Sequence, residues 1–203
     1  KIKRNLGLFF RSFFPIFAKS NKNRRKKMKY DVMIIGSGPG GYVAAVRAAQ
    51  LGFNTAVVER ENLGGICLNW GCIPTKALLK SAQAFNYIKH SETYGVKIEG
   101  SFKPDMNAIV ERSRTVAANM GKGVAHLMQK NNITVIEGEA RLTKDRKVSV
   151  EMKDGSGTQV FEADHIILAT GARSRNLPNM PQDGKKIIGY REAMTLREQP
   201  ESM

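Results

Sequence analysis

The sequence contains two cysteines, Cys67 and Cys72, which stand five positions apart. Two thiols this close can form a disulfide, bind a metal ion or remain as a structural pair. In a regular helix a step of five residues covers about 7.5 Å, which exceeds the roughly 4.4–6.8 Å between the Cα atoms of a disulfide. Pro74 cannot donate a hydrogen bond to the preceding turn, so we expect the regular helix to begin near Ile73 and residues 67–71 to form a bent approach. The pair can then bridge, which leaves redox chemistry and structural burial both open.

Metal binding is the weakest of these interpretations. A zinc site built on two cysteines needs two further ligands. The histidines are scattered singly, and none stands at finger-like spacing from the cysteines: they are His90, His126 and His165. We therefore predict no metal site, and we expect these histidines to lie on the surface.

A glycine-rich turn precedes the cysteines. Residues 30–35 are predicted to form a buried parallel strand, followed by an alanine-rich helix that ends at Leu51 before Gly52. Residues 55–59 form the next strand, so the fold opens with a βαβ unit. The turn between the first strand and the helix consists of Gly36, Ser37, Gly38, Pro39, Gly40 and Gly41.

This turn has the Gly-x-Gly-x-x-Gly pattern of a dinucleotide-binding loop. Gly36 permits the tight turn, Gly38 lets a pyrophosphate approach the backbone, and Gly41 lets the helix pack on the strand. The helix N-terminus then faces the anion. Glu59 ends the second strand, eighteen residues after Gly41, where a carboxylate can accept hydrogen bonds from a ribose diol. The alternative for Glu59 is an exposed acid at a strand end.

The remaining pattern predicts two long helices and then a β-meander. The first helix should run from about residue 73 to about 90, and the second should start at Pro104. Short strands are expected at residues 133–136, 147–152, 158–161 and 165–169, and the chain beyond them is loop-like. The predicted fold class is α/β, with a parallel sheet and a β-meander.

The net charge of +15 belongs to a tail. Residues 1–29 carry eleven Lys or Arg and no acid, which leaves 22 basic and 18 acidic residues in the rest, a net of +4. The rest therefore has an ordinary enzyme surface, and the basic run shows no aromatic interleaving that would indicate nucleic-acid binding. We predict neither a nucleic-acid partner nor a transmembrane segment.

The tail, residues 1–29, has three interpretations. It is a transit peptide, a surface anchor, or a non-native segment upstream of the true start at Met28. A transit peptide would place the protein in the mitochondrial matrix, whereas a non-native upstream segment would fit a protein of the bacterial cytoplasm.

Taken together, the motifs resemble the flavoprotein pyridine-nucleotide disulfide oxidoreductases and, within them, the dihydrolipoamide dehydrogenases. The resemblance runs from Met28 to the last residue and rests mainly on residues 64–76, GGICLNWGCIPTK. It implies a Rossmann-like FAD-binding domain of the glutathione-reductase type. It also implies a Cys67–Cys72 disulfide against the flavin, with Cys67 as the interchange thiol and Cys72 as the thiol that exchanges electrons with the flavin.

The resemblance extends to further cofactor contacts. Lys76 matches a lysine near the flavin N5; the less favoured alternative is a solvated helix lysine. Besides the glycine-rich turn, Glu59, the cysteines and Lys76, the residues expected at FAD are Arg60, Gly65, Ala140, Ala169, Thr170 and Gly171.

The implied activity is the oxidation of protein-bound dihydrolipoamide to lipoamide, with FAD as cofactor and NAD⁺ as acceptor. The implied partner is the lipoyl domain of a 2-oxo acid dehydrogenase complex, and the full-length enzyme would be a homodimer. We expect residues 30–190 to form the FAD-binding domain and 191–203 a linker to an absent NAD-binding domain, so the chain alone should be inactive. The alternatives are another flavoprotein disulfide reductase, such as a mercuric or glutathione reductase, and a non-catalytic FAD-binding module.

Overall fold

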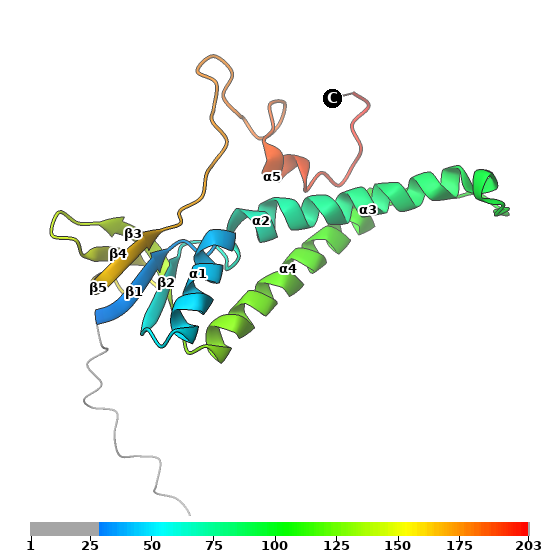
Figure 1. Cartoon of the computed structure of the whole chain (residues 1–203). Helices are drawn as coiled ribbons and strands as arrows, with labels where there is room; N and C mark the ends of the chain where they lie inside the picture. Colours follow the sequence, from blue (N-terminus) through cyan, green and yellow to red (C-terminus); the bar gives the residue numbers. More distant parts are fainter. Residues whose placement is uncertain (1–28, 203) are drawn as a thin grey trace, which may run out of the picture.

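The computed structural model of the protein describes residues 29–202, and the interpretations of the basic tail therefore lie outside the described residues. Figure 1 shows the elements. They are β1 (Lys29–Ile35), α1 (Pro39–Gln50), β2 (Thr55–Glu59), α2 (Gly65–Trp70), α3 (Cys72–Lys89), the 3-10 helix η1 (Ser91–Tyr94), α4 (Met106–Lys130), β3 (Thr134–Leu142), β4 (Val148–Met152), β5 (Thr158–Leu168) and α5 (Tyr190–Ala193).

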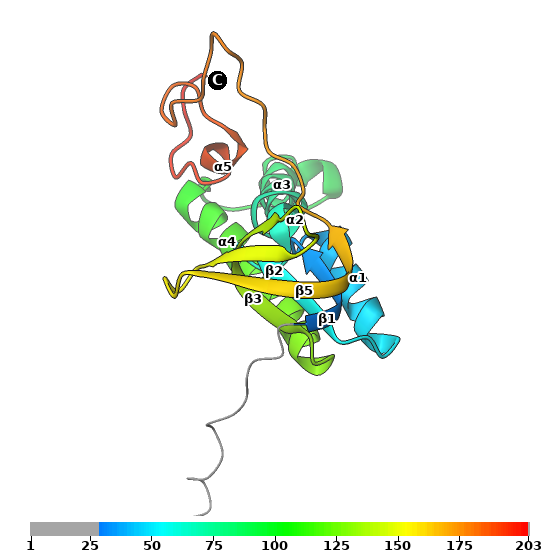
Figure 2. The ribbon, with the colours of Figure 1, turned by 90° about the vertical axis from the view of Figure 1, so that its left-hand side faces the viewer.

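The five strands form a closed ring in which two long strands belong to two sheets. The parallel sheet has the order β3, β2, β1, β5. Beyond Gly138, β3 continues into an antiparallel meander with β4, and β4 pairs with the first residues of β5. The two views in Figures 1 and 2 show β4 lying across the parallel sheet, on the side away from α1 and α4.

The sheet buries both of its faces, because alternate residues of β1 point to opposite sides. Met33 and Ile35 pack toward the meander, with Val148, Val150 and Phe161. On the other face, β1 and β2 contribute to a cluster with residues of α1, α2 and α4; its buried members include Val32, Ile34, Ala45, Val57, Leu68, Val124 and Met128. The order of layers is therefore helices, parallel sheet, meander, which confirms the predicted α/β class with a parallel sheet and a β-meander.

Three local expectations were wrong. Residues 67–71 do not form an irregular approach, because 65–70 make a short helix, α2. The predicted strands at 158–161 and 165–169 are one continuous strand, β5, which changes sheet without a break. Helix α4 begins at Met106 instead of Pro104, since the Asp105 carboxylate accepts a hydrogen bond from the Ala108 N–H at 3.0 Å and caps the helix.

Within residues 29–202, no helix has both the length and the apolar run needed to cross a bilayer. His90, His126 and His165 are exposed, as the sequence predicted.

Candidate functional site

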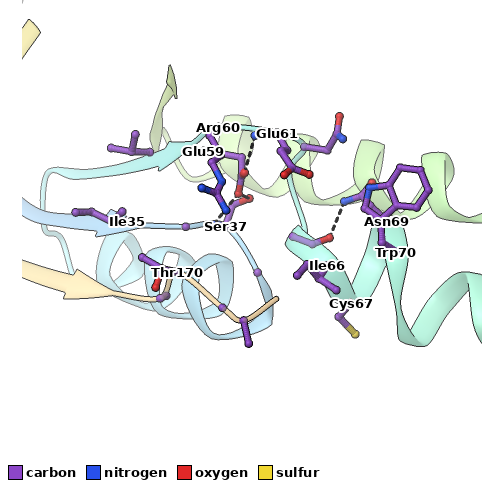
Figure 3. Close-up of a pocket in the computed structure, with 18 of the residues that line it drawn as sticks. Ile35, Ser37, Glu59, Arg60, Glu61, Ile66, Cys67, Asn69, Trp70 and Thr170 are labelled. Atoms are coloured by element: carbon purple, nitrogen blue, oxygen red, sulfur yellow. Dashed lines mark hydrogen bonds between the residues drawn. The ribbon is translucent and has the colours of Figure 1, made fainter. Parts of the chain in front are cut away.

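The carboxyl ends of the parallel strands meet at one edge of the sheet, which is where open α/β folds bind ligands. The turn after β1, the end of β2 and the segment after β5 surround a cavity of about 350 Å³ there. Figure 3 shows these segments converging, with α2 on the opposite side of the cavity. Parallel register thus brings together three segments that are far apart in the sequence.

The glycine-rich turn has no room for a side chain at Gly36 and Gly41, which pack against the protein, and open space at Gly38, which lines the cavity, and at Gly40, which does not. Gly36 adopts a φ of +98°, and a Cβ there would overlap the carbonyl group of Ala169. A Cβ on Gly41 would overlap the carbonyl oxygen of Gly36, whereas one on Gly38 or Gly40 would have no atom within 4 Å. The backbone at the N-terminus of α1 therefore faces the cavity at Gly38 without a covering side chain, which is the arrangement that binds anions at helix N-termini.

Glu59 is held in place by backbone and side-chain donors. Its Oε2 accepts hydrogen bonds from the Ser37 N–H at 3.0 Å and the Ser37 hydroxyl at 2.6 Å. Its Oε1 accepts from the Glu61 N–H at 2.8 Å. A carboxylate has about four acceptor positions, so Glu59 keeps about one for a ligand in the cavity that it lines.

The Cys67–Cys72 disulfide joins α2 to α3 across a break at Gly71. Gly64 lies before α2 with a φ of +92°, a left-handed conformation that favours glycine. At Gly71 the backbone leaves helical geometry, with φ −146° and ψ −116°. The break lets the Cα atoms of the cysteines approach to 4.9 Å, inside the range for a disulfide. The chain between the two cysteines does leave helical geometry, as expected, and it does so at Gly71.

Asn69 stabilises the short helix that carries Cys67. Its side-chain amide donates to the Leu63 carbonyl at 3.0 Å and the Gly65 carbonyl at 2.9 Å, and Figure 3 shows the second of these bonds. Because α2 is only six residues long, these bonds replace much of the support that a longer helix would provide by itself.

Two arginines enclose Trp70, the last residue of α2. The guanidinium carbon of Arg114 lies 4.8 Å from the centroid of the Trp70 ring, and that of Arg191 lies 5.1 Å from it. Arg191 also forms an ion pair with Glu61 at 2.9 Å. Burial lowers the pKa of Arg114, but an arginine remains protonated in proteins. Trp70 therefore connects the redox helix to α4 on one side and to α5 on the other.

The cavity gathers most of the predicted site residues. Those that line it are Gly36, Ser37, Gly38, Pro39, Glu59, Arg60, Gly65, Cys67, Ala140, Ala169, Thr170 and Gly171. Gly40, Gly41, Cys72 and Lys76 do not line it. Cys72 and Lys76 are exposed on the first turns of α3, whereas Cys67 is half-buried. The assignment of Cys72 and Lys76 to the flavin stays a prediction.

Sequence reasoning missed Glu61, Trp70, Arg173 and Arg191, which also line the cavity. Both arginines pair with Glu61. Arg191 lies in a segment that the sequence assigned to a linker, and its pairing with a residue 130 positions away left no local signal. Trp70 offered one clue, since it is the only tryptophan of the chain and stands between the two cysteines.

The chain belongs to the pyridine nucleotide-disulphide oxidoreductase family, whose model matches residues 30–202. Among its relatives, a dihydrolipoyl dehydrogenase of Rhizobium etli is 52% identical over 187 residues, covering 86% of this chain and 39% of that protein. The mitochondrial dihydrolipoyl dehydrogenase 1 of Arabidopsis thaliana is 41% identical over 175 residues, covering 85% of this chain and 34% of that protein.

A solved structure, LpdA from Mycobacterium tuberculosis, superposes with a TM-score of 0.73 at 27% identity, covering 82% of this chain and 37% of that one. The chain thus spans less than two fifths of the length of these relatives. The resemblance drawn from the motifs is confirmed.

Membership of this family implies FAD as the cofactor, and the residues present fit it. Gly38 leaves open space at the N-terminus of α1, where a pyrophosphate would find backbone N–H donors. Gly65 packs so closely that a Cβ on it would lie 2.7 Å from the Gly38 Cα. The backbone of the glycine-rich turn and of Gly65, the first residue of α2, thus forms a cradle for the pyrophosphate, and Cys67 lines the same cavity two residues further along α2.

Proposed function

We propose that this chain is the FAD-binding and redox-disulfide part of a dihydrolipoyl dehydrogenase, which oxidises protein-bound dihydrolipoamide with NAD⁺ as the final acceptor. The observation that carries the proposal is a disulfide that bridges a helix break beside a dinucleotide cavity, with Cys67 in the cavity wall. The names of the relatives support the choice of substrate. The proposed FAD-binding domain is residues 30–190.

The disulfide exchanges two electrons and two protons with a dithiol. A thiolate of dihydrolipoamide attacks Cys67, forming a mixed disulfide and releasing Cys72 as a thiolate. The second lipoyl thiol then attacks the lipoyl sulfur that is bonded to Cys67 in the mixed disulfide. This closes the lipoyl disulfide and releases Cys67 as a thiolate. FAD held by the residues of this cavity would supply the two-electron chemistry that links the reduced cysteines to NAD⁺.

The protein's own contribution is to bind and to position. Gly38 admits the pyrophosphate, Glu59 accepts from the adenosine ribose, and Ala140 lies along the adenine end. On the other side, Cys72 and Lys76 are proposed to lie against the flavin, where a lysine cation would favour negative charge on the reduced ring.

The proposed partner is the lipoyl domain of a 2-oxo acid dehydrogenase complex, and the complete enzyme is proposed to be a homodimer. The relatives of this chain include bacterial proteins and two plant proteins named as mitochondrial, which supports a bacterial cytoplasm or a mitochondrial matrix as the location.

FAD binding should quench the fluorescence of Trp70, which lines the cavity and is the only tryptophan in the sequence. Titration of the purified chain with FAD should therefore give a saturable loss of emission. Gly38→Ala should weaken binding at least about tenfold, because its methyl group would occupy the path of the pyrophosphate. Gly40→Ala is the matched control: Gly40 was expected at FAD with the rest of the turn, but it does not line the cavity and a Cβ there would have no atom within 4 Å, so this variant should bind like the wild type. Equal binding by the Gly38 variant would contradict the proposed position of the pyrophosphate.

The substrate is tested on the complete gene product. Lipoamide should be reduced with NADH at least about a hundredfold more efficiently, in kcat/KM, than oxidised glutathione or Hg²⁺, because a substrate held by specific contacts gains several kcal/mol in the transition state. A preference for glutathione or Hg²⁺ would reassign the enzyme within the family. Absence of turnover with all three, together with retained FAD, would favour a non-catalytic flavin module.

A further inference from the structure

We propose that Arg112 and Arg114 of α4 act as a bracket that holds the two cysteine-bearing helices at bridging distance in both the oxidised and the reduced protein. The two arginines are positioning residues, because they touch the helices and not the sulfur atoms. The inference rests on the proposed redox role of Cys67 and Cys72 and adds how the reduced pair is kept ready to close.

Arg114 holds α2, the helix that carries Cys67. Its Nη1 donates to the Asn69 carbonyl at 2.8 Å, and its guanidinium stacks on Trp70. Asn69 and Trp70 are the last two residues of α2, so both contacts act at the end that faces the break. A carbonyl there has no partner within the helix, which makes the arginine its hydrogen-bond donor.

Arg112 holds α3, the helix that begins with Cys72. Its Nη1 donates to the Ala77 carbonyl at 2.8 Å and to the Ser81 hydroxyl at 3.3 Å. Ala77 is buried, so this contact reaches the packed side of α3. The two cysteine-bearing helices are therefore tied separately, by two arginines only two positions apart on one helix.

Helix α4, which carries both arginines, is packed into the core along one face. Ser113, between the two arginines, is fully buried, and its hydroxyl donates to the Val110 carbonyl at 2.7 Å. Val110, Ala117, Val124 and Met128 are buried along the same helix. Neither arginine contact involves a cysteine, so reducing the disulfide removes none of the hydrogen bonds that join α2 and α3 to α4.

This arrangement should stabilise the disulfide. Reduction by a dithiol transfers two electrons and two protons: the dithiol becomes a cyclic disulfide, and Cys67 and Cys72 become two thiols. If the helices moved apart after reduction, the effective concentration of one thiol at the other would fall and the disulfide would be easier to reduce. The bracket prevents that relaxation.

The test is the redox equilibrium of the purified chain in mixtures of reduced and oxidised dithiothreitol, without FAD. Free thiols are trapped by alkylation and counted by mass. In the double variant Arg112→Gln and Arg114→Gln, the equilibrium constant for reduction should rise about tenfold, which is about 30 mV toward a more oxidising potential. Each single variant should show a smaller rise in the same direction.

Two further variants separate the bracket from a simple effect of charge. Lys122→Gln removes the same charge from an exposed position of α4 and should leave the equilibrium unchanged. Arg114→Lys keeps the charge but loses the planar fork, so it should behave like Arg114→Gln. If the arginines instead stabilised thiolates by charge, the glutamine variants would be harder to reduce and the lysine variant would match the wild type. Either of these results would overturn the proposal.

Hydrogen exchange on the wild type tests the same idea without a substitution. The backbone amides of α2 should keep their protection within about threefold when the disulfide is reduced. Melting of α2 on reduction would overturn the bracket. Because both measurements omit FAD and substrate, a negative result here leaves the proposed function standing, while loss of FAD binding leaves the bracket standing.

Discussion

The variant Gly41→Ala is expected to lose about 3 kcal/mol of unfolding free energy. A Cβ at this position would overlap the carbonyl oxygen of Gly36, which belongs to the backbone and cannot turn away as a side chain can. Relief requires α1 to move away from β1. The loss is measured by urea unfolding, followed through the fluorescence of Trp70.

Gly40→Ala is the matched control, because it adds the same methyl group one residue earlier, where a Cβ would have no atom within 4 Å. Alanine is the better helix former, so this variant should be as stable as the wild type or up to about 1 kcal/mol more stable. Equal stability of the two variants would show that α1 does not pack on the glycine-rich turn as described.

Cys67→Ser and Cys72→Ser should each convert a transient mixed disulfide into a lasting one. When the reduced protein reacts with an aromatic disulfide that releases a coloured thiolate, the first cysteine to react forms an adduct. In the wild type the other cysteine displaces that adduct at an effective concentration of about millimolar or more. Since the chain has no third cysteine, only another molecule at micromolar concentration can do so in the variants. The adduct should therefore live at least about 10³-fold longer.

The readout is the amount of coloured thiolate, two equivalents per wild-type chain and one per variant, with the adduct seen by mass. Ser156→Cys places an additional thiol in an exposed turn of the meander and controls for general thiol reactivity. Added to either single-cysteine variant, it should release one more equivalent of coloured thiolate and should not shorten the life of the adduct on the remaining cysteine of the pair. Lasting adducts on both cysteines of the wild type would show that the two thiols do not act together.

Those parts of the fold that depend on short-range pattern were predictable from the sequence. The apolar run at 30–35, the glycine-rich turn and the acid at Glu59 follow rules of local geometry, and the structure places them as a βαβ unit. The helix that begins with Cys72 was predicted within a residue, because Pro74 favours the first turn.

What the sequence could not supply depends on long-range contacts. Helix α2 is too short to be stable by its own propensity, and it forms because Asn69 and Arg114 satisfy its carbonyl groups. The pairing of Arg191 with Glu61 spans 130 positions, so no periodicity could reveal it. The continuity of β5 was hidden because one strand serves two sheets, and its side-chain pattern changes where it passes from one to the other.

Both β3 and β5 belong to two sheets. This limits the positions at which proteins of this family can gain or lose residues. Deleting or inserting one residue within β5 would invert the facing of the side chains on one side of the change relative to those on the other, so β5 could not keep its register in the meander and in the parallel sheet at once. It would also shift Ala169, which follows the strand directly and closes against Gly36. Length variation among descendants of this fold should therefore collect at sites such as the exposed turn around Gly155 or the segment after Tyr94, and should be nearly absent within the two long strands. Those same two places are where an engineer could insert a tag or a second domain without disturbing the cofactor cradle.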